Sequence, residues 1–216
     1  QGGLNATGLQ ERLEGDGIAV TGSFTASAPS DPYAAMSGLM FYPRPGVDAS
    51  WINTIIALSV FAFENYNGPS GLARQTLDPS VYDDMKAIYT RSYKGQQGLK
   101  DIMTRLGNRS VADYMRPELR DPVAFATSPY GKILARAETY RQSFKAPLRM
   151  YYGSSDEVVK PMIGQLATIY QAILIGNLAE QSANPVSAIE VPGATHRLTF
   201  VSAAPSAKSW MDSLRK

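Results

Sequence analysis

The sequence contains no cysteine and only one histidine, His196. Without cysteine, the chain can form no disulfide, carry out no thiol chemistry and hold no cysteine-based zinc site. Long apolar runs are absent too, because the longest candidate, the mixed segment 51–63, falls short of the roughly 18 residues that a membrane span needs. We therefore expect no membrane span, no metal and no cofactor.

A strong charge of either sign is also missing. The chain has 21 basic and 19 acidic residues, which gives a formal net charge of +2. This balance does not favour nucleic acid as a partner, because no segment is crowded with lysine and arginine. The 216 residues are 44% hydrophobic and 19% charged, the balance of a globular protein with a sizeable core, so a small or neutral partner is the better prediction.

The first 32 residues have the pattern of half a parallel α/β unit. Leu4, Leu9 and Leu13 recur at near-helical spacing, and the following Gly-Asp-Gly tolerates the positive φ that ends a helix. Residues 18–24 then form an apolar run, which predicts a buried strand. Helix followed by strand indicates an α/β core that begins with residues 1–32.

Residues 33–146 predict a large helical insertion, because they show no strand signal. One helix is indicated at 50–66, a segment that is apolar nearly all round. Another begins at Pro79, directly after the cap Asp78, and two more are indicated at 99–106 and at 133–143. Ser110 and Asp113 have the spacing of a capping box for a further short helix.

The α/β pattern returns over residues 147–216. Segments 148–152 and 187–191 read as strands, 161–177 and 203–214 as helices. An acidic loop containing Asp156 follows the first of these strands, and a loop containing His196 follows the second. In the helix at 161–177, the residues predicted to face inward are Met162, Leu166, Ile169, Tyr170 and Ile173.

Asp156 and His196 are the candidate catalytic residues. Functional groups of open α/β sheets collect in loops at the carboxyl ends of the strands, where both residues are expected. The opening Gln1-Gly2-Gly3 has the form of a nucleophile elbow that continues from a preceding serine, which we expect directly before Gln1. Singly, Asp156 is also interpretable as a turn former or helix cap, and His196 as a surface or structural residue. Glu157 competes as the acid, although we expect it to point into the following turn.

Several segments resemble the secreted bacterial and fungal serine lipases and esterases of the α/β-hydrolase fold, including the secretory lipase group. They are Tyr-Tyr-Gly-Ser-Ser-Asp-Glu-Val-Val at 151–159, Ile-Gly-Asn at 175–177, Val-Pro-Gly-Ala-Thr-His-Arg at 191–197, and the opening Gln-Gly-Gly. The resemblance implies that Asp156 is the acid, that His196 is the base, and that the backbone N–H of Gln1 contributes to the oxyanion hole. It also implies a secreted or periplasmic location.

We therefore predict the C-terminal part of an α/β-hydrolase, a mostly parallel sheet with flanking helices and a helical lid at 33–146. It would cleave small-molecule or lipid-like carboxylic esters through an acyl-enzyme, with the serine supplied by an N-terminal part of the same polypeptide. Trp51, Phe61 and Phe63 are candidates for an acyl pocket or, alternatively, for the helical core. An acyltransferase, a peptidase and a non-catalytic binding protein remain alternative functions.

Overall fold

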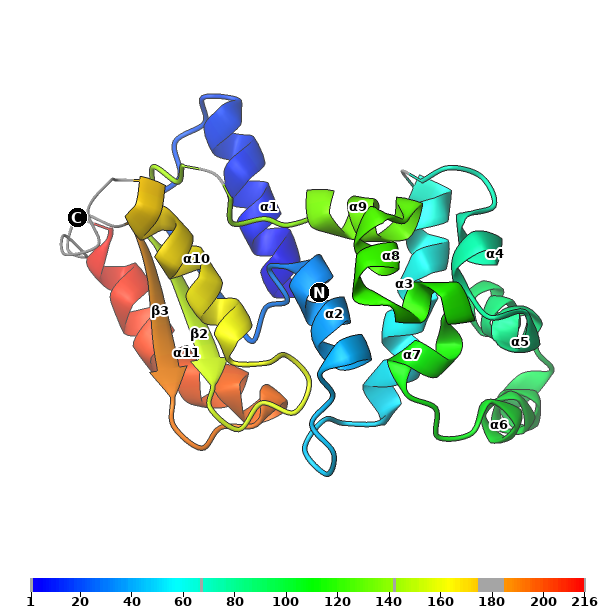
Figure 1. Ribbon diagram of the computed structural model, residues 1–216. Coiled ribbons are helices and arrows are strands. Elements are labelled where there is room, and N and C mark those ends of the chain that lie inside the picture. The colour runs from blue at the N-terminus through cyan, green and yellow to red at the C-terminus, as the bar shows by residue number, and fades with distance from the viewer. Residues whose placement is uncertain (1, 67, 142, 175–184, 216) are drawn as a thin grey trace. The chain divides into compact units, whose positions relative to one another are not determined.

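The computed structural model describes residues 2–66, 68–141, 143–174 and 185–215 (Figure 1). The chain forms two compact units. One is an α/β unit made of Gln1–Ala35 and Ala137–Lys216, and the other is a helical unit, Met36–Arg136. The helical unit is thus shorter at both ends than the predicted insertion at 33–146.

The α/β unit contains a sheet of three parallel strands among the described residues, in the order β1-β2-β3. The strands are β1 (Ser23–Ala26), β2 (Leu148–Gly153) and β3 (Val186–Val191). Ser23 pairs with Leu148, and Leu148 pairs with Val186. The prediction of a mixed α/β fold with a parallel sheet is confirmed.

Helices cover both faces of this sheet. Helices α1 (Gly2–Gly15) and α10 (Met162–Leu174) lie on one face, where Leu148, Met150 and Val186 form a core with Leu166 and Tyr170. Helix α11 (His196–Ser213) lies on the other, where Ala203 and Ala207 pack against Tyr151. The strands are buried between two helical layers, which explains their apolar runs.

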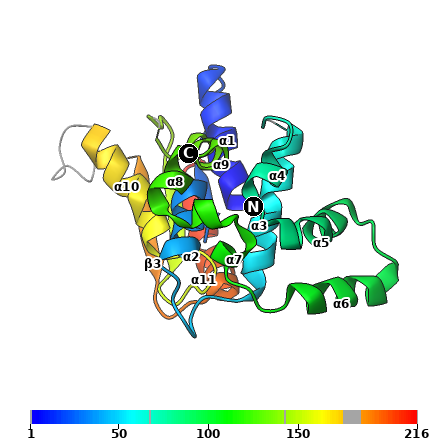
Figure 2. The same cartoon turned by 45° about the vertical axis from the view of Figure 1, so that its right-hand side comes forward.

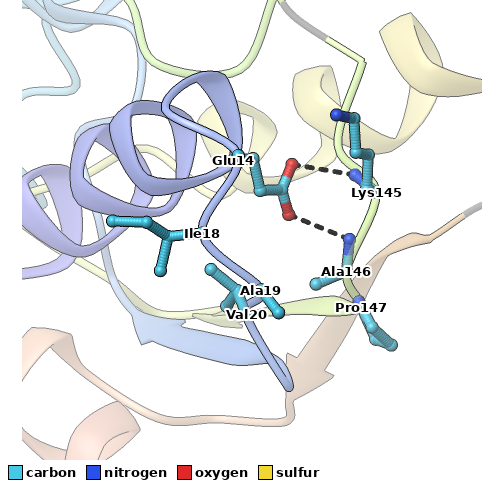
Figure 3. Close-up of a pocket in the computed structure, with 8 residues that line it drawn as sticks. Glu14, Ile18, Ala19, Val20, Lys145, Ala146 and Pro147 are labelled. Atoms are coloured by element: carbon cyan, nitrogen blue, oxygen red, sulfur yellow. Dashed lines mark hydrogen bonds between the residues drawn. The ribbon is translucent and has the colours of Figure 1, made fainter.

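Glu14 ties the end of α1 to the segment that leads into β2 (Figure 3). One carboxylate oxygen accepts the backbone N–H of Lys145 at 2.9 Å, and the other accepts that of Ala146 at 2.9 Å. The Gln10 amide donates to the same carboxylate at 2.8 Å. A cavity of about 390 Å³ adjoins Glu14 at the end of the sheet where the strands begin, so it lies opposite the loops that follow β2 and β3.

Four predicted boundaries were wrong. The helix expected at 99–106 begins earlier, at Gly95. The strand expected at 18–24 is β1 at Ser23–Ala26, because Ile18 donates its N–H to Leu13 to close α1 instead of pairing in the sheet. The helix expected at 133–143 runs from Pro129 to Arg136, after a Ser128 side chain that accepts the Gly131 N–H. The closing helix begins at His196 rather than residue 203, with Pro205 inside it.

The inward face predicted for α10 was also partly wrong. Leu166 and Tyr170 do pack against the core, but Met162, Ile169 and Ile173 are each more than half exposed. The helix carries apolar residues on more than one side, and the sheet contacts only one side. Apolar spacing alone therefore could not select the buried face.

The helical unit is organised around α3 (Trp51–Tyr66), against which several shorter helices pack (Figure 2). The chain passes from the α/β unit into the helical unit within α2 (Pro32–Phe41). The other helices of the helical unit are α4 (Leu72–Thr76), α5 (Pro79–Thr90), α6 (Gly95–Leu106), α7 (Val111–Tyr114), η1 (Pro117–Arg120), α8 (Pro122–Thr127) and α9 (Pro129–Arg136). The predicted capping box of Ser110 and Asp113 is confirmed at the start of α7. Across the described residues of both units, no helix is long and apolar enough to cross a membrane.

Candidate active site

Asp156 and His196 form a hydrogen-bonded pair. Nδ1 of the His196 ring lies 3.1 Å from Oδ2 of Asp156. The carboxylate is 1% exposed, whereas the imidazole side chain is 35% exposed. With Asp156 ionised, Nδ1 must carry the proton to donate this bond, so Nε2 is the ring nitrogen that remains for proton transfer.

Strand order explains why residues 40 positions apart meet. Because β2 and β3 are parallel neighbours, the loops that follow them leave the same end of the sheet (Figure 1). Asp156 lies in the first loop, and His196 is the first residue of α11, directly after the second loop. The two residues therefore lie at the carboxyl edge of the sheet, where α/β folds place their functional groups.

Backbone contacts hold the two loops together. Ser155 donates its N–H to the carbonyl of Ala194 at 3.1 Å, and Gly193 donates its N–H to the Ser154 hydroxyl at 2.7 Å. Gly153 permits this approach, since a Cβ there would overlap the carbonyl oxygen of Ala194 and the hydroxyl of Thr199. A glycine at the end of β2 is therefore required by the distance between the loops.

The environment of Asp156 favours its charged form. Burial by itself raises the pKa of a carboxyl group, but here the hydrogen bond with His196 opposes burial, as do the Ser27 hydroxyl and the amides of Val159 and Val158. The two amides donate to Oδ1, each at 2.8 Å. Together these groups hold the pKa of Asp156 below its usual value. Asp156 is thus both a turn former and the partner of His196.

Ser27 lies beside this pair at the end of β1 and was not predicted. It is 6% exposed and has a φ of 49°, a conformation that non-glycine residues seldom adopt. Its hydroxyl lowers the pKa of Asp156, although it makes no hydrogen bond of regular geometry. Only the pairing of β1 with β2 brings Ser27 there, so the sequence held no signal for it.

Glu157 is the competing candidate for the acid, but its carboxylate has a different partner. Its Oε2 accepts the backbone N–H of His196 at 3.0 Å, and the ring of His196 bonds to Asp156. The prediction that Glu157 points into the following turn was wrong. The contact spans 39 positions, so only the folded loops could reveal it.

The remaining predicted site residues lie elsewhere. Gln1, the predicted oxyanion donor, is outside the described residues. Trp51 begins α3 and is 56% exposed. Phe61 is buried and stacks with Tyr89 at a centroid distance of 5.4 Å, and Phe63 meets Tyr130 edge-on at 6.2 Å. These aromatic contacts belong to the helical unit, and the acyl-pocket role of the three residues stays a prediction.

The described part of the chain shows no grouping of three histidine, cysteine, aspartate or glutamate side chains that could hold a metal ion. The chemistry that the Asp156–His196 pair can perform is proton transfer. A buried carboxylate that orients an imidazole is the arrangement of a general base and general acid.

No protein-family model and no curated protein matches this sequence. Solved structures do resemble it. A point variant of the rice cell wall degrading esterase LipA from Xanthomonas oryzae matches with a TM-score of 0.71 and 17% identity, over 99% of this chain and 57% of LipA. A "putative hydrolase" from Legionella pneumophila matches with a TM-score of 0.70 and 17% identity, over 99% of this chain and 53% of that protein.

The chain therefore has a fold found in esterases and hydrolases, and it spans slightly more than half the length of these structures. LipA itself, without the substitution, matches with a TM-score of 0.62 and 18% identity. This likeness establishes the fold, and the function has to be argued from the site.

Proposed function

We propose that the protein is a serine-dependent hydrolase of carboxylic esters, with Asp156 and His196 as the acid and base of its triad. The observation that carries the proposal is the 3.1 Å contact between Nδ1 of His196 and the buried carboxylate of Asp156 at the carboxyl edge of a parallel sheet. The chain's likeness to an esterase fold supports it.

In the proposed mechanism, Nε2 of His196 removes the proton of a serine hydroxyl as that oxygen attacks the ester carbonyl. The imidazolium then returns the proton to the leaving alcohol, and water repeats the sequence to release the acid. Asp156 keeps the proton on Nδ1 and stabilises the imidazolium. We place the nucleophile directly before Gln1, whose N–H would donate to the developing oxyanion. No serine or threonine hydroxyl within the described residues is hydrogen-bonded to His196.

The test is turnover of short p-nitrophenyl esters by the intact protein and by its His196→Ala variant. We expect kcat to fall by about 10³-fold or more without a change in the circular dichroism spectrum. Arg197→Ala is the matched control, because Arg197 is the exposed next residue of the same helix turn. Equal rates in His196→Ala and the wild type would rule out the triad.

Substrate choice separates this function from its alternatives. The same triad serves acyltransferases and peptidases, so cleavage of peptide anilides without ester turnover would replace the esterase assignment with a peptidase. Ester consumption only in the presence of a second alcohol would indicate acyl transfer. Binding of an ester without any turnover would favour a non-catalytic protein of this fold.

A further inference from the structure

We infer that Glu157 is a positioning residue for His196: it holds the main chain of the histidine while its neighbour Asp156 holds the ring. The catalytic consequence of this inference rests on the proposed function. Two adjacent carboxylates in one loop thus have separate tasks, and both act on the same histidine.

The first support is the contact itself. Oε2 of Glu157 accepts the backbone N–H of His196 at 3.0 Å, and Oδ2 of Asp156 lies 3.1 Å from Nδ1 of the same residue. His196 is therefore held at two points, one on its backbone N–H and one at Nδ1 of its ring. A ring held only at Nδ1 could still tilt with its backbone, whereas this arrangement restricts both.

The second support is that the first turn of α11 lacks a hydrogen-bond acceptor from its own N-cap side chain. The first amides of any helix lack acceptors within that helix. In α11 the N-cap residue Thr195 makes no side-chain cap, and the first turn contains no acidic residue. Glu157 supplies an acceptor to the first amide, and its negative charge lies at the positive end of the helix dipole.

The third support is that hydrogen bonds fix the loop that contains Glu157. Its neighbour Asp156 is fixed by the amides of Val158 and Val159 at 2.8 Å each. The loop is further joined to the β3 loop through the Ser155 and Gly193 amides. Because the backbone on both sides of Glu157 is fixed, its carboxylate holds the backbone N–H of His196 in a fixed position.

Loss of Glu157 should therefore loosen the first turn of α11 and let the imidazole sample orientations in which Nε2 misses the serine hydroxyl. Misorientation of a base lowers the rate of the chemical step more than it lowers substrate binding. The expected signature is a reduced kcat with a nearly constant KM, in a protein that remains folded.

The experiment compares Glu157→Ala and Glu157→Gln with the wild type in the intact protein. Glu11→Ala serves as the control, since Glu11 is an exposed glutamate of the same α/β unit. Because His196 is the only histidine, ¹⁵N-histidine labelling gives one amide and one imidazole to follow by NMR. We expect Glu157→Ala to speed hydrogen exchange of the His196 amide by about tenfold or more.

The same variant should shift the imidazole ¹⁵N signals away from a single Nδ1–H tautomer and lower kcat for a p-nitrophenyl ester by about tenfold. Glu157→Gln should recover part of each loss, because its amide oxygen can still accept the bond but carries no charge. Glu11→Ala should match the wild type.

Unchanged exchange and unchanged imidazole signals in Glu157→Ala would overturn the inference, whatever the activity. Changed signals with an unchanged kcat, in a protein that His196→Ala inactivates, would also overturn it, because the anchoring would have no catalytic effect. If the wild type hydrolyses no ester, the proposed function fails on that result alone. The NMR comparison still decides whether Glu157 orders His196.

Discussion

At the scale of single residues, small structural details determine the geometry of the candidate site. The pair Asp156 and His196 depends on Gly153, which has no side chain to separate the two loops. Ser27, a residue with positive φ, lies beside the buried carboxylate, and its hydroxyl lowers the pKa of Asp156. Neither residue is itself reactive in the proposed mechanism.

Gly153→Ala should damage both stability and activity. The added methyl group would overlap the carbonyl oxygen of Ala194 and the Thr199 hydroxyl, so the His196 loop must move. We expect the free energy of unfolding, measured in urea, to fall by about 1–3 kcal/mol. Gly15→Ala is the control, since a Cβ at Gly15 meets nothing within 4 Å. Equal stability of the two variants would contradict the assigned role of Gly153.

Glu14→Gln should destabilise the protein in a pH-dependent manner. Burial raises the pKa of Glu14, but the amides of Lys145 and Ala146 and the Gln10 side chain outweigh it and hold the pKa below the usual value of 4.5. A lowered pKa contributes stability above the unfolded value, and this contribution is lost as pH falls through the folded value.

At pH 7 the Gln variant should lose about 1–3 kcal/mol, because an amide cannot accept both backbone N–H groups. The difference from the wild type should shrink as the pH falls below 4.5. Urea unfolding at several pH values measures it, with Glu11→Gln, an exposed change on the same helix, as the control. A difference that stays constant with pH would show that the Glu14 charge is not responsible.

At the scale of helices and strands, local sequence signals set the helix ends that have side-chain caps. Asp78 accepts the Ser80 amide at 2.9 Å at the start of α5, where Pro79 occupies the first turn. In α11 the N-cap residue Thr195 makes no side-chain cap, and Glu157 provides an acceptor from another loop. A helix start that is capped by its own N-cap side chain can be predicted from the sequence. A helix start whose acceptor comes from a distant loop cannot.

Asp78→Ala should therefore lower the free energy of unfolding by about 1 kcal/mol through loss of a helix N-cap. Chemical denaturation at neutral pH measures the effect. Asp83→Ala makes the same chemical change at an exposed position within α5, away from the cap. If both variants lost equal stability, the effect would stem from charge rather than capping.

At the scale of the whole molecule, the α/β unit and the helical unit each have a core of their own. The α/β core lies on the two faces of the sheet. The helical unit buries Tyr114, whose hydroxyl bonds to Thr54 of α3 at 2.8 Å. Cores of separate units are expected to open as separate cooperative regions.

We accordingly expect Glu14→Gln to speed hydrogen exchange in β2 while leaving α3 unchanged. Glu14 hydrogen-bonds with Gln10, Lys145 and Ala146, which all belong to the α/β unit. Hydrogen-exchange mass spectrometry of peptides from the two elements measures both regions in one experiment. Equal acceleration in β2 and α3 would mean that the two units open together.

The sequence by itself determined the α/β class, the positions of β2 and β3, two capped helix starts and the choice of Asp156 and His196 as the candidate pair. These depend on apolar periodicity, on local caps and on the rule that parallel strands present their loops at one edge. The sequence did not determine the bounds of β1, the buried face of α10 or the start of α11. These features depend on how the helices and strands pack in the folded chain.

Only the tertiary structure decided the roles of Gly153, Ser27 and Glu157. Each acts through a neighbour distant in the chain: Gly153 through Ala194, Ser27 through Asp156, and Glu157 through the His196 amide. No local pattern encodes such contacts, because they exist only once the sheet has brought its loops together. The sequence supplied the candidate acid and base, and the packing of the sheet placed them and the residues that hold them.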